Sequence, residues 1–309
     1  MGLTMNLPIV YHDQYVVPLP DGHRFPMEKF SLLYELLLRE KVVKSNNIYT
    51  PECPEKSLLE LVHCPDYITA YCQGTLSDKV QRRIGLPWSE ALVKRTCVAV
   101  GGTILTAKLA LKFGLACNTA GGTHHAFPDY GSGFCIFNDL AIATRVLQKL
   151  KLVKTVLIID LDVHQGDGTA KIFQNDLTVF TFSMHCEANF PREKQKSDLD
   201  VSLPQGLDDD GYLQILSQHL SDLLSQIKPD LILYDAGVDI HANDHFGKLS
   251  ITDTGIYRRE RLVLSSCIAE GYPVASVIGG GYAKDLKSLV YRHSLLHRAA
   301  KDVYQSHQL

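Results

Sequence analysis

Two aspartates and a histidine alternate with apolar residues in the stretch T-V-L-I-I-D-L-D-V-H-Q-G-D-G-T, residues 155–169. The apolar start predicts a buried strand of a parallel sheet, and side chains alternate between the two faces of such a strand. If the extended conformation continues, Asp160, Asp162 and His164 share one face at the carboxyl end of the strand, where open α/β sheets place their ligands. In isolation the pattern fits equally well an acid that caps the following helix.

Other loops that are predicted to follow strands carry side chains that could serve the same site. The Gly-rich segment 119–139 is too long for a simple connection and holds the adjacent pair His124 and His125, and such loops are usually functional. Asp239 follows one apolar run, and Tyr282 follows another through three glycines. Because the carboxyl ends of parallel strands meet at one edge of a sheet, we expect these residues to converge.

The residue types in these loops suit metal-assisted hydrolysis of an amide. Asp162, His164 and Asp239 would bind a divalent metal and leave a position open for water or substrate, as a hydrolytic zinc site requires. Zinc lowers the pKa of its bound water to roughly 7 and can polarise a carbonyl oxygen. His124 and His125 could take a proton from the attacking water and give one to the departing amine, since imidazole titrates near neutrality.

Three further residues could support this chemistry. Asp160 and Asp167 can orient the two imidazoles, and the Tyr282 hydroxyl could donate to the oxyanion that forms on attack. Each residue alone has an ordinary explanation, such as a helix cap, an incidental histidine pair or a flexible turn. Their joint occurrence at the ends of separate strands favours a catalytic site.

The elements that must position these residues alternate between strands and helices along the whole chain. Strands are predicted at residues 7–11, 115–118, 156–159, 177–184, 229–234 and 273–278. Helices are predicted at residues 27–41, 57–71 with a break at Pro65, 89–113, 138–150, 169–173, 208–227, 252–271 and from 284 onward. This alternation predicts one doubly wound, mainly parallel sheet in a single domain spanning residues 1–309.

Composition limits the class of protein. The 309 residues are 45% hydrophobic and 21% charged with a net charge of -3, which is ordinary for a globular protein and lacks the basic excess of a nucleic-acid binder. The eight cysteines are scattered without a C-x-x-C pair, which argues against a disulfide framework and favours a reducing, cytoplasmic location. We expect no signal peptide at the amino terminus and no segment long enough to cross a membrane.

The Pro- and Gly-rich loop that ends at Pro26 contains His23, Arg24 and Phe25. These side chains could line a cleft, but pattern alone favours a surface turn.

The motifs G-G-T-H-H-A, G-S-G-F-C-I-F-N-D, D-L-D-V-H-Q-G-D-G, A-G-V-D and G-G-G-Y resemble, in order and separation, those of the histone deacetylase family of zinc-dependent acyl-lysine and acyl-amine hydrolases. The resemblance covers nearly the whole chain. It is closest to the class IV group and bacterial relatives, because Gln165 stands where other classes usually carry a second histidine. It implies the arginase/deacetylase fold, a three-layer α/β/α arrangement around a mainly parallel sheet.

The resemblance also implies a role for each candidate residue. The zinc ligands would be Asp162, His164 and Asp239. His125 backed by Asp167 would be the general base and acid, His124 backed by Asp160 the electrostatic partner, and Tyr282 the residue that polarises the substrate carbonyl.

The resemblance further implies a tunnel for the acyl-lysine side chain and a second cation. Phe134, beside Gly133, matches one aromatic wall, and Phe190 is the candidate for the opposite wall. A potassium ion next to the zinc would involve Asp160, Asp162, His164 and Ser183.

The sequence therefore predicts a zinc-dependent amidohydrolase whose partner is an acylated lysine in a protein or peptide, or another acylated amine. Removal of acetyl from the ε-amine of lysine is the favoured reaction. The alternatives are a deacylase for acetylpolyamines, a deacylase for long-chain acyl-lysine, and a binder of acyl-lysine without catalysis. A Tyr282→Phe change separates the last reading from the others, because only catalysis needs the hydroxyl.

Overall fold

The computed structural model describes residues 6–309, and within them eight strands form one sheet in which every pairing is parallel. The strands are β1 (Ile9–Val10), β2 (Ile48–Tyr49), β3 (Leu115–Asn118), β4 (Val156–Asp160), β5 (Val179–Cys186), β6 (Leu199–Leu203), β7 (Leu231–Asp235) and β8 (Val274–Val277). Their order is β2-β1-β3-β8-β7-β4-β5-β6. The predicted parallel sheet is confirmed, and all its carboxyl ends lie at one edge.

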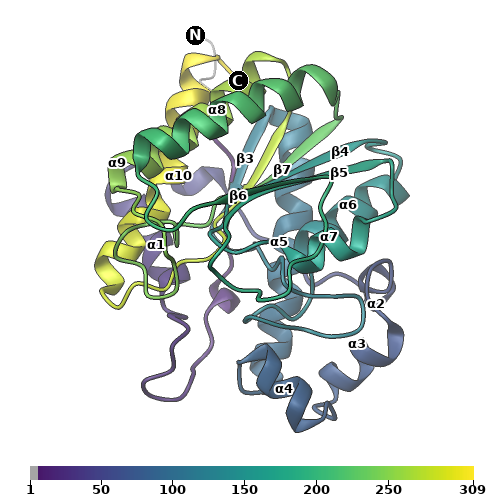
Figure 1. The fold of residues 1–309 in the computed structure, drawn as a ribbon. Coiled ribbons are helices and arrows are strands. Elements are labelled where there is room, and N and C mark those ends of the chain that lie inside the picture. Colours follow the sequence, from purple (N-terminus) through teal and green to yellow (C-terminus); the bar gives the residue numbers. More distant parts are fainter. Residues whose placement is uncertain (1–5) are drawn as a thin grey trace.

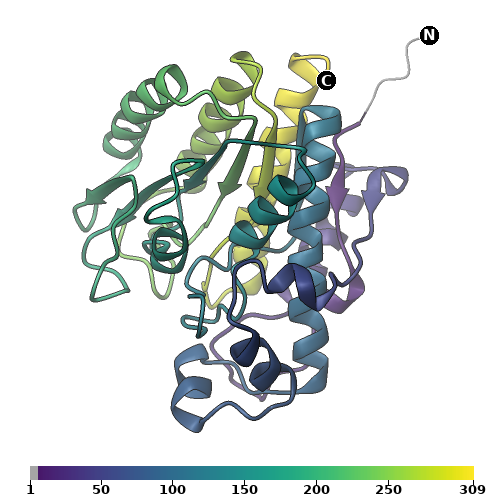
Figure 2. The same cartoon turned by 90° about the vertical axis from the view of Figure 1, so that its right-hand side faces the viewer.

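Helices cover both faces of the sheet, giving three layers (Figures 1 and 2). The helices are α1 (Lys29–Arg39), α2 (Lys56–Leu59), α3 (Pro65–Cys72), α4 (Asp78–Ile84), α5 (Glu90–Phe113), α6 (Asp139–Lys149), α7 (Asp167–Phe173), α8 (Asp209–Gln226), α9 (Asp253–Ala269) and α10 (Leu286–Ser306). Helices α1, α8, α9 and α10 pack in one layer, and α5, α6 and α7 pack in the other. The short helices α2 to α4 gather beside one end of α5 (Figure 2).

Local sequence signals explain where the main helices begin. Ser89, Asn138 and Thr252 each accept a hydrogen bond from a backbone N–H in the first turn of α5, α6 and α9, respectively, as N-cap residues do. Pro65 opens α3 and thereby divides the helix predicted over residues 57–71 into two, because its ring cannot continue a helix from the preceding turn.

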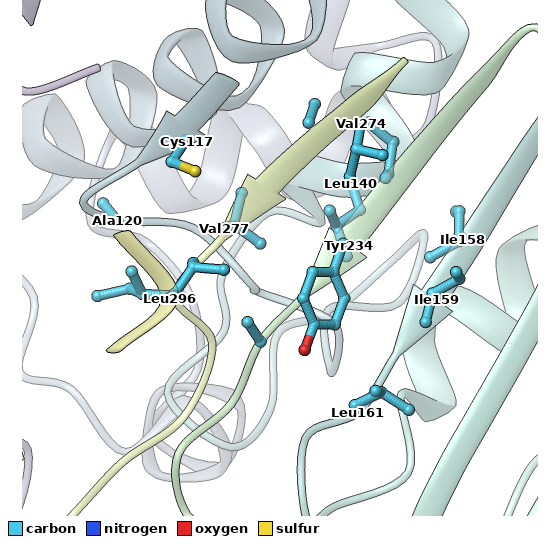
Figure 3. Packing of buried hydrophobic residues seen from close by; sticks show 14 of the residues in the cluster. Cys117, Ala120, Leu140, Ile158, Ile159, Leu161, Tyr234, Val274, Val277 and Leu296 are labelled. Atoms are coloured by element: carbon cyan, nitrogen blue, oxygen red, sulfur yellow. The ribbon is translucent and has the colours of Figure 1, made fainter. Parts of the chain in front are cut away.

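The centre of the sheet is apolar on both faces. Every residue of β4, β7 and β8 is buried, as expected for parallel strands covered by helices on each side. Figure 3 shows strand residues such as Tyr234 and Val277 packed with Leu140 of α6 and Leu296 of α10. This core fixes the strand ends relative to one another.

Two glycines inside α5 allow other parts of the chain to approach this helix closely. A Cβ atom on Gly101 would lie 1.9 Å from the Glu52 carbonyl oxygen, and one on Gly102 would lie 2.0 Å from the Tyr15 hydroxyl. The helix is also long and apolar enough to span a membrane by length and composition, so the expectation that no segment reaches that size is wrong. Two thirds of its apolar window, 67%, is buried inside the protein, which is the pattern of a core helix.

The structure differs from the sequence prediction in two other respects. Strands β2 and β6 and helix α4 were not predicted, because they are short and lack a clear periodic pattern. Strand β4 ends at Asp160 and does not continue to His164. The backbone N–H of Asp162 donates to the Asp160 side chain at 3.1 Å, and that of His164 to the Asp162 side chain at 2.9 Å; such turns replace strand pairing. The amino terminus, for which we expect no signal peptide, begins with residues 1–5, and these lie outside the described residues.

Candidate active site

Five loops at the carboxyl edge of the sheet bring the candidate residues together. They follow β3, β4, β5, β7 and β8, and they carry in turn the histidine pair, the Asp-x-His segment, Phe190, Asp239 and Tyr282. Apart from Tyr282, which is half-buried, and Phe190, which is exposed, these side chains are buried. Residues separated by more than 150 positions in the sequence therefore share one site.

Asp162, His164 and Asp239 form a cluster of three potential metal ligands. His164 Nδ1 lies 3.0 Å from one Asp162 oxygen and 3.1 Å from one Asp239 oxygen. Backbone N–H groups hold the other carboxylate oxygens: Gly280 donates to Asp162 at 2.7 Å, and Val163 donates to Asp239 at 2.9 Å. The ligand atoms are therefore fixed before any ion binds.

The donor set fits a divalent metal. Around a tetrahedral ion with bonds of about 2.0 Å, ligand atoms lie about 3.3 Å apart, close to the 3.0 and 3.1 Å separations here. The cluster also favours positive charge: burial alone would lower the pKa of His164, but Asp162 and Asp239 raise it to about 10. Burial and the Asp162 charge in turn raise the pKa of Asp239 to about 7, so a cation at this point would relieve repulsion between the two carboxylates.

Carboxylates surround His124 beside this cluster. Its Nδ1 lies 2.7 Å from an Asp160 oxygen and 3.8 Å from an Asp235 oxygen. Burial opposes the charged ring, yet the carboxylates of Asp160 and Asp162 raise the pKa of His124 well above its usual value. An imidazolium is therefore favoured at this position.

The surroundings of His125 favour its neutral form. Its Nδ1 lies 2.6 Å from an Asp167 oxygen, and this oxygen also accepts from the Gly168 N–H at 2.9 Å. Burial, followed by the charge on His124, lowers the pKa of His125 despite the Asp167 carboxylate. With its Nδ1–H given to Asp167, the ring keeps a free lone pair on Nε2, which is the state that a general base needs.

Tyr282 is positioned by its backbone. Its N–H donates to Asp244 at 2.7 Å, and Lys29 Nζ donates to the carbonyl oxygens of Gly279 and Gly281 at 3.5 and 3.3 Å. Burial and the nearby carboxylates of the metal cluster raise the pKa of the Tyr282 phenol well above 10. The hydroxyl is therefore protonated and available as a hydrogen-bond donor.

A cavity of about 510 Å³ reaches His164 of the metal cluster and Tyr282. Phe134, Phe190, Phe246 and Tyr282 line it, together with Gly133 and His164. The Phe246 ring lies 5.0 Å from the Tyr282 ring and 6.4 Å from the Phe134 ring. A Cβ on Gly133 would approach His125 Cδ2 to 2.7 Å and Phe190 to 3.4 Å, so a glycine keeps the passage to the histidine open.

The residues predicted for a potassium site adjoin the metal cluster. Ser183 on β5 pairs in register with Asp160 on β4, and its hydroxyl lies 3.0 Å from His185 Nδ1. Asp162 and His164 lie in the loop that directly follows β4.

Sequence reasoning missed several residues of this site. Phe246 gives the cavity a further aromatic wall, Asp244 anchors the Tyr282 loop, and Lys29 lies buried beneath it with its pKa lowered to about 8 by burial. Asp235 is fully buried with no hydrogen-bond partner on either oxygen among the residues described, and burial raises its pKa well above the usual range. Only Asp235, at the end of a predicted strand, carried a signal that could have revealed it.

The interpretation of residues 23–25 as a plain surface turn is wrong. Arg24 lines the cavity, and the Phe25 ring lies 5.3 Å from Phe134 and 6.3 Å from Tyr282. His23 Nε2 lies 3.1 Å from the Gly85 carbonyl oxygen, just after α4. The turn reaches the site because it contacts the distant segment that follows α4. No local sequence pattern indicates this contact.

Comparisons with known proteins place this geometry in context. Residues 23–296 match the model of the histone deacetylase domain. An uncharacterized protein of Picosynechococcus sp. is 70% identical over 97% of this chain and 100% of its own length. The acetoin utilization protein AcuC of Staphylococcus aureus (strain COL) is 32% identical over 85% of this chain and 73% of its own. The crystal structure of an HDAC homolog from Aquifex aeolicus superposes with a TM-score of 0.81, at 24% identity, over 98% of this chain and 89% of that one. The likeness to the solved structure shows a shared fold, the arginase/deacetylase fold that the sequence motifs imply.

Proposed function

The chain belongs to the histone deacetylase family of hydrolases, and from this premise we propose that it is a zinc-dependent amidohydrolase that removes acetyl from the ε-amine of lysine in proteins. The observation that carries the proposal is the convergence of two histidine–aspartate pairs on one His/Asp/Asp cluster at the inner end of an aromatic cavity. This arrangement unites a base, a cation, a metal site and a passage for a long side chain.

Asp162, His164 and Asp239 would hold the metal. When bound, a divalent ion supplies Lewis acidity that makes water more acidic and polarises the acyl carbonyl. Two carboxylates and one imidazole suit zinc, and ferrous iron accepts the same ligand types. The proposal includes a potassium ion beside Asp160 and Ser183.

His125 is proposed to act as the base and then as the acid. Its Nε2 takes a proton from water as the water oxygen bonds to the acyl carbon, and it returns that proton to the lysine nitrogen as the carbon–nitrogen bond breaks. The products are acetate and the free amine. Asp167 holds Nδ1–H and so keeps the ring in the required tautomer.

His124 and Tyr282 are proposed to stabilise the charge that develops. The imidazolium favoured at His124 offers positive charge to an oxyanion, and the protonated Tyr282 hydroxyl donates a hydrogen bond to it. The Gly280 N–H that bonds Asp162 belongs to the same loop, so the position of Tyr282 is coupled to the metal cluster.

The cavity supports a long, uncharged side chain as the substrate. Phe134 and Phe190 are the proposed walls around the lysine methylenes, and Phe246 adds a further aromatic side chain to the lining. The proposed partner is an acylated lysine in a protein or peptide. A cytoplasmic location is part of the proposal, since all eight cysteines are free thiols, and fractionation of cells of the source organism would test it.

Steady-state hydrolysis of matched acetyl-lysine, myristoyl-lysine and acetylpolyamine substrates tests the proposal. We expect the zinc-loaded protein to release acetate fastest from acetyl-lysine peptide and a chelator to abolish turnover. Faster turnover of the polyamine or of the myristoyl substrate would contradict the substrate assignment, and turnover that survives complete metal removal would contradict the metal-dependent reaction.

A further inference from the structure

The mouth of the cavity is cationic, and from this we propose that the acylated lysine is recognised within an acidic segment, with aspartate or glutamate beside it. The inference rests on the proposed function, because it specifies the substrate of that same site. Four cationic side chains line the cavity, and we call them the cationic rim: Arg24, Arg82, Arg83 and Lys248.

Within the described residues, no carboxylate pairs with the cationic rim. All four side chains belong to exposed residues, and no aspartate or glutamate of residues 6–309 lines the cavity. None of the four forms an ion pair within the same residues. The chain as a whole has a net charge of -3, so this positive patch does not reflect a general excess of basic residues.

Backbone contacts tie the arginines to the wall of the cavity. The Gly133 N–H donates to the Arg83 carbonyl oxygen at 3.2 Å, and the Phe134 N–H donates to the Ile84 carbonyl oxygen at 2.8 Å. His23, next to Arg24, contacts the Gly85 carbonyl oxygen at 3.1 Å. The end of α4 and the 23–25 turn are thereby fixed to the wall of the cavity, which places their cations beside it.

The contacts that these cations make are with neutral groups. The Arg24 guanidinium lies 5.7 Å from the centre of the Phe246 ring, and that of Arg83 lies 4.3 Å from the centre of the Tyr130 ring. Lys248 Nζ donates to the Ala188 carbonyl oxygen at 2.6 Å. Stacking and carbonyl contacts orient the side chains without neutralising them.

Asp21, Asp78 and Asp244 lie within four residues of these cations in the sequence, and none of them forms an ion pair with the rim. Asp244 is directed inward. Its oxygens accept from the backbone N–H groups of Tyr282, Phe246 and Gly247 at 2.7, 2.9 and 3.2 Å. Asp244 therefore binds backbone N–H groups and forms no ion pair with the exposed cations.

A carboxylate next to the acylated lysine would meet two or more of these cations. Arginine binds carboxylates through paired N–H donors, and a patch of one sign raises the local concentration of oppositely charged substrates. The same patch repels a polyamine, whose remaining amines are protonated. Since the partners are exposed and solvated, each contact is modest, and we expect a discrimination of about fivefold to tenfold from two of them.

Three acetyl-lysine peptides that differ only beside the acetyl-lysine, with Asp, Asn or Lys on both sides, test the inference. We expect kcat/KM to be about fivefold to tenfold higher for the Asp peptide than for the Asn peptide and lowest for the Lys peptide, with the difference in KM. The preference should shrink as ionic strength rises to about 1 M, because salt screens exposed charges.

The double change Arg82→Gln with Arg83→Gln locates the preference. We expect it to reduce the Asp/Asn ratio to less than about twofold, whereas Lys149→Gln with Lys228→Gln, two exposed cations that precede β4 and β7 at the opposite edge of the sheet, leaves the ratio unchanged. Equal turnover of the three peptides by the wild type, or a ratio that survives the arginine changes, would overturn the inference alone. No turnover of any peptide would overturn the proposed function on which it rests.

Discussion

Replacing Asp167 by Asn isolates the contribution of one carboxylate to the base. Asn keeps the shape of the side chain and an oxygen that can accept from His125 Nδ1 and the Gly168 N–H, which lie 2.6 and 2.9 Å from it in the native protein. The change therefore removes a negative charge with little rearrangement. In the native protein this charge opposes the burial that lowers the pKa of His125.

The expected loss follows from the basicity of the ring. Removing an opposite charge at this distance lowers a pKa by about 1 to 3, and with about half of that change expressed in the rate of proton transfer, kcat falls about 3-fold to 30-fold. Truncation of the ring itself, His125→Ala, removes the base and should cost about 10²-fold to 10⁴-fold.

Two measurements test this reasoning. The first is the pH dependence of kcat for the metal-loaded proteins. A base works when it is neutral, so kcat of the wild type should fall only below pH 6.5, where His125 becomes protonated. In Asp167→Asn the fall should begin at a still lower pH. The ratio of variant to wild-type kcat should therefore rise as the pH falls. Protonation of the metal ligands affects both proteins and cancels from the ratio.

The second measurement is a double-mutant cycle. Because Asp167 is argued to act through His125, Asp167→Asn should cost almost nothing in a His125→Ala background. A full additional loss in the double variant, or a variant-to-wild-type ratio that falls with pH, would refute the assignment of His125 as the base that Asp167 supports.

Three further predictions concern stability and metal binding. Arg259→Met should lower the free energy of unfolding by about 3 to 5 kcal/mol in urea titrations, because it strands the buried Glu260 carboxylate; a loss below about 1 kcal/mol would contradict this. Gly280→Ala should abolish stoichiometric zinc binding, since its Cβ would lie 2.3 Å from an Asp239 oxygen and 2.5 Å from an Asp162 oxygen. Gly206→Ala strains the backbone at a φ of +79° but places its Cβ where no atom lies within 4 Å, so it should bind zinc normally. Burial lowers the pKa of His63 from the usual 6.5 to about 4 in the folded chain. The neutral ring therefore contributes fully to the free energy of unfolding above pH 6.5, and up to about 3 kcal/mol of this free energy is lost as the pH falls towards 4. The melting temperature should therefore fall between pH 7 and pH 5, less steeply for His63→Gln, and equal slopes would sink the explanation.

The parts of the site that the sequence predicted are those with local signals. A buried strand that runs into polar residues predicts a ligand site at the strand end, and this rule located Asp162, His164 and Asp239 on their loops. The alternation rule failed at Asp160, because side-chain acceptors from Asp160 and Asp162 take the backbone N–H groups that a continuing strand would use. Asp160 consequently contacts His124 at the strand end.

The parts that could not be predicted depend on contacts between distant segments. Phe246 and Arg83 reach the cavity only because α4 and the loop after β7 fold over the same entrance. Neither residue stands in a periodic pattern or next to a strand end, so nothing local distinguishes it from a surface residue. Gln165, noted only as a departure from a motif, bonds Gln195 and Asp200 and so holds the loop that carries Phe190.

The central claim is that this site hydrolyses an acyl-lysine amide with the Tyr282 hydroxyl stabilising the charge that develops. The most direct test compares acetate release from an acetyl-lysine peptide by the zinc-loaded wild type and by Tyr282→Phe, with zinc content measured for both. We expect one zinc per chain in each protein. We also expect kcat to be at least about 10²-fold lower in the variant, which is the magnitude typical of an oxyanion donor. A variant that binds zinc and turns over as fast as the wild type would contradict it.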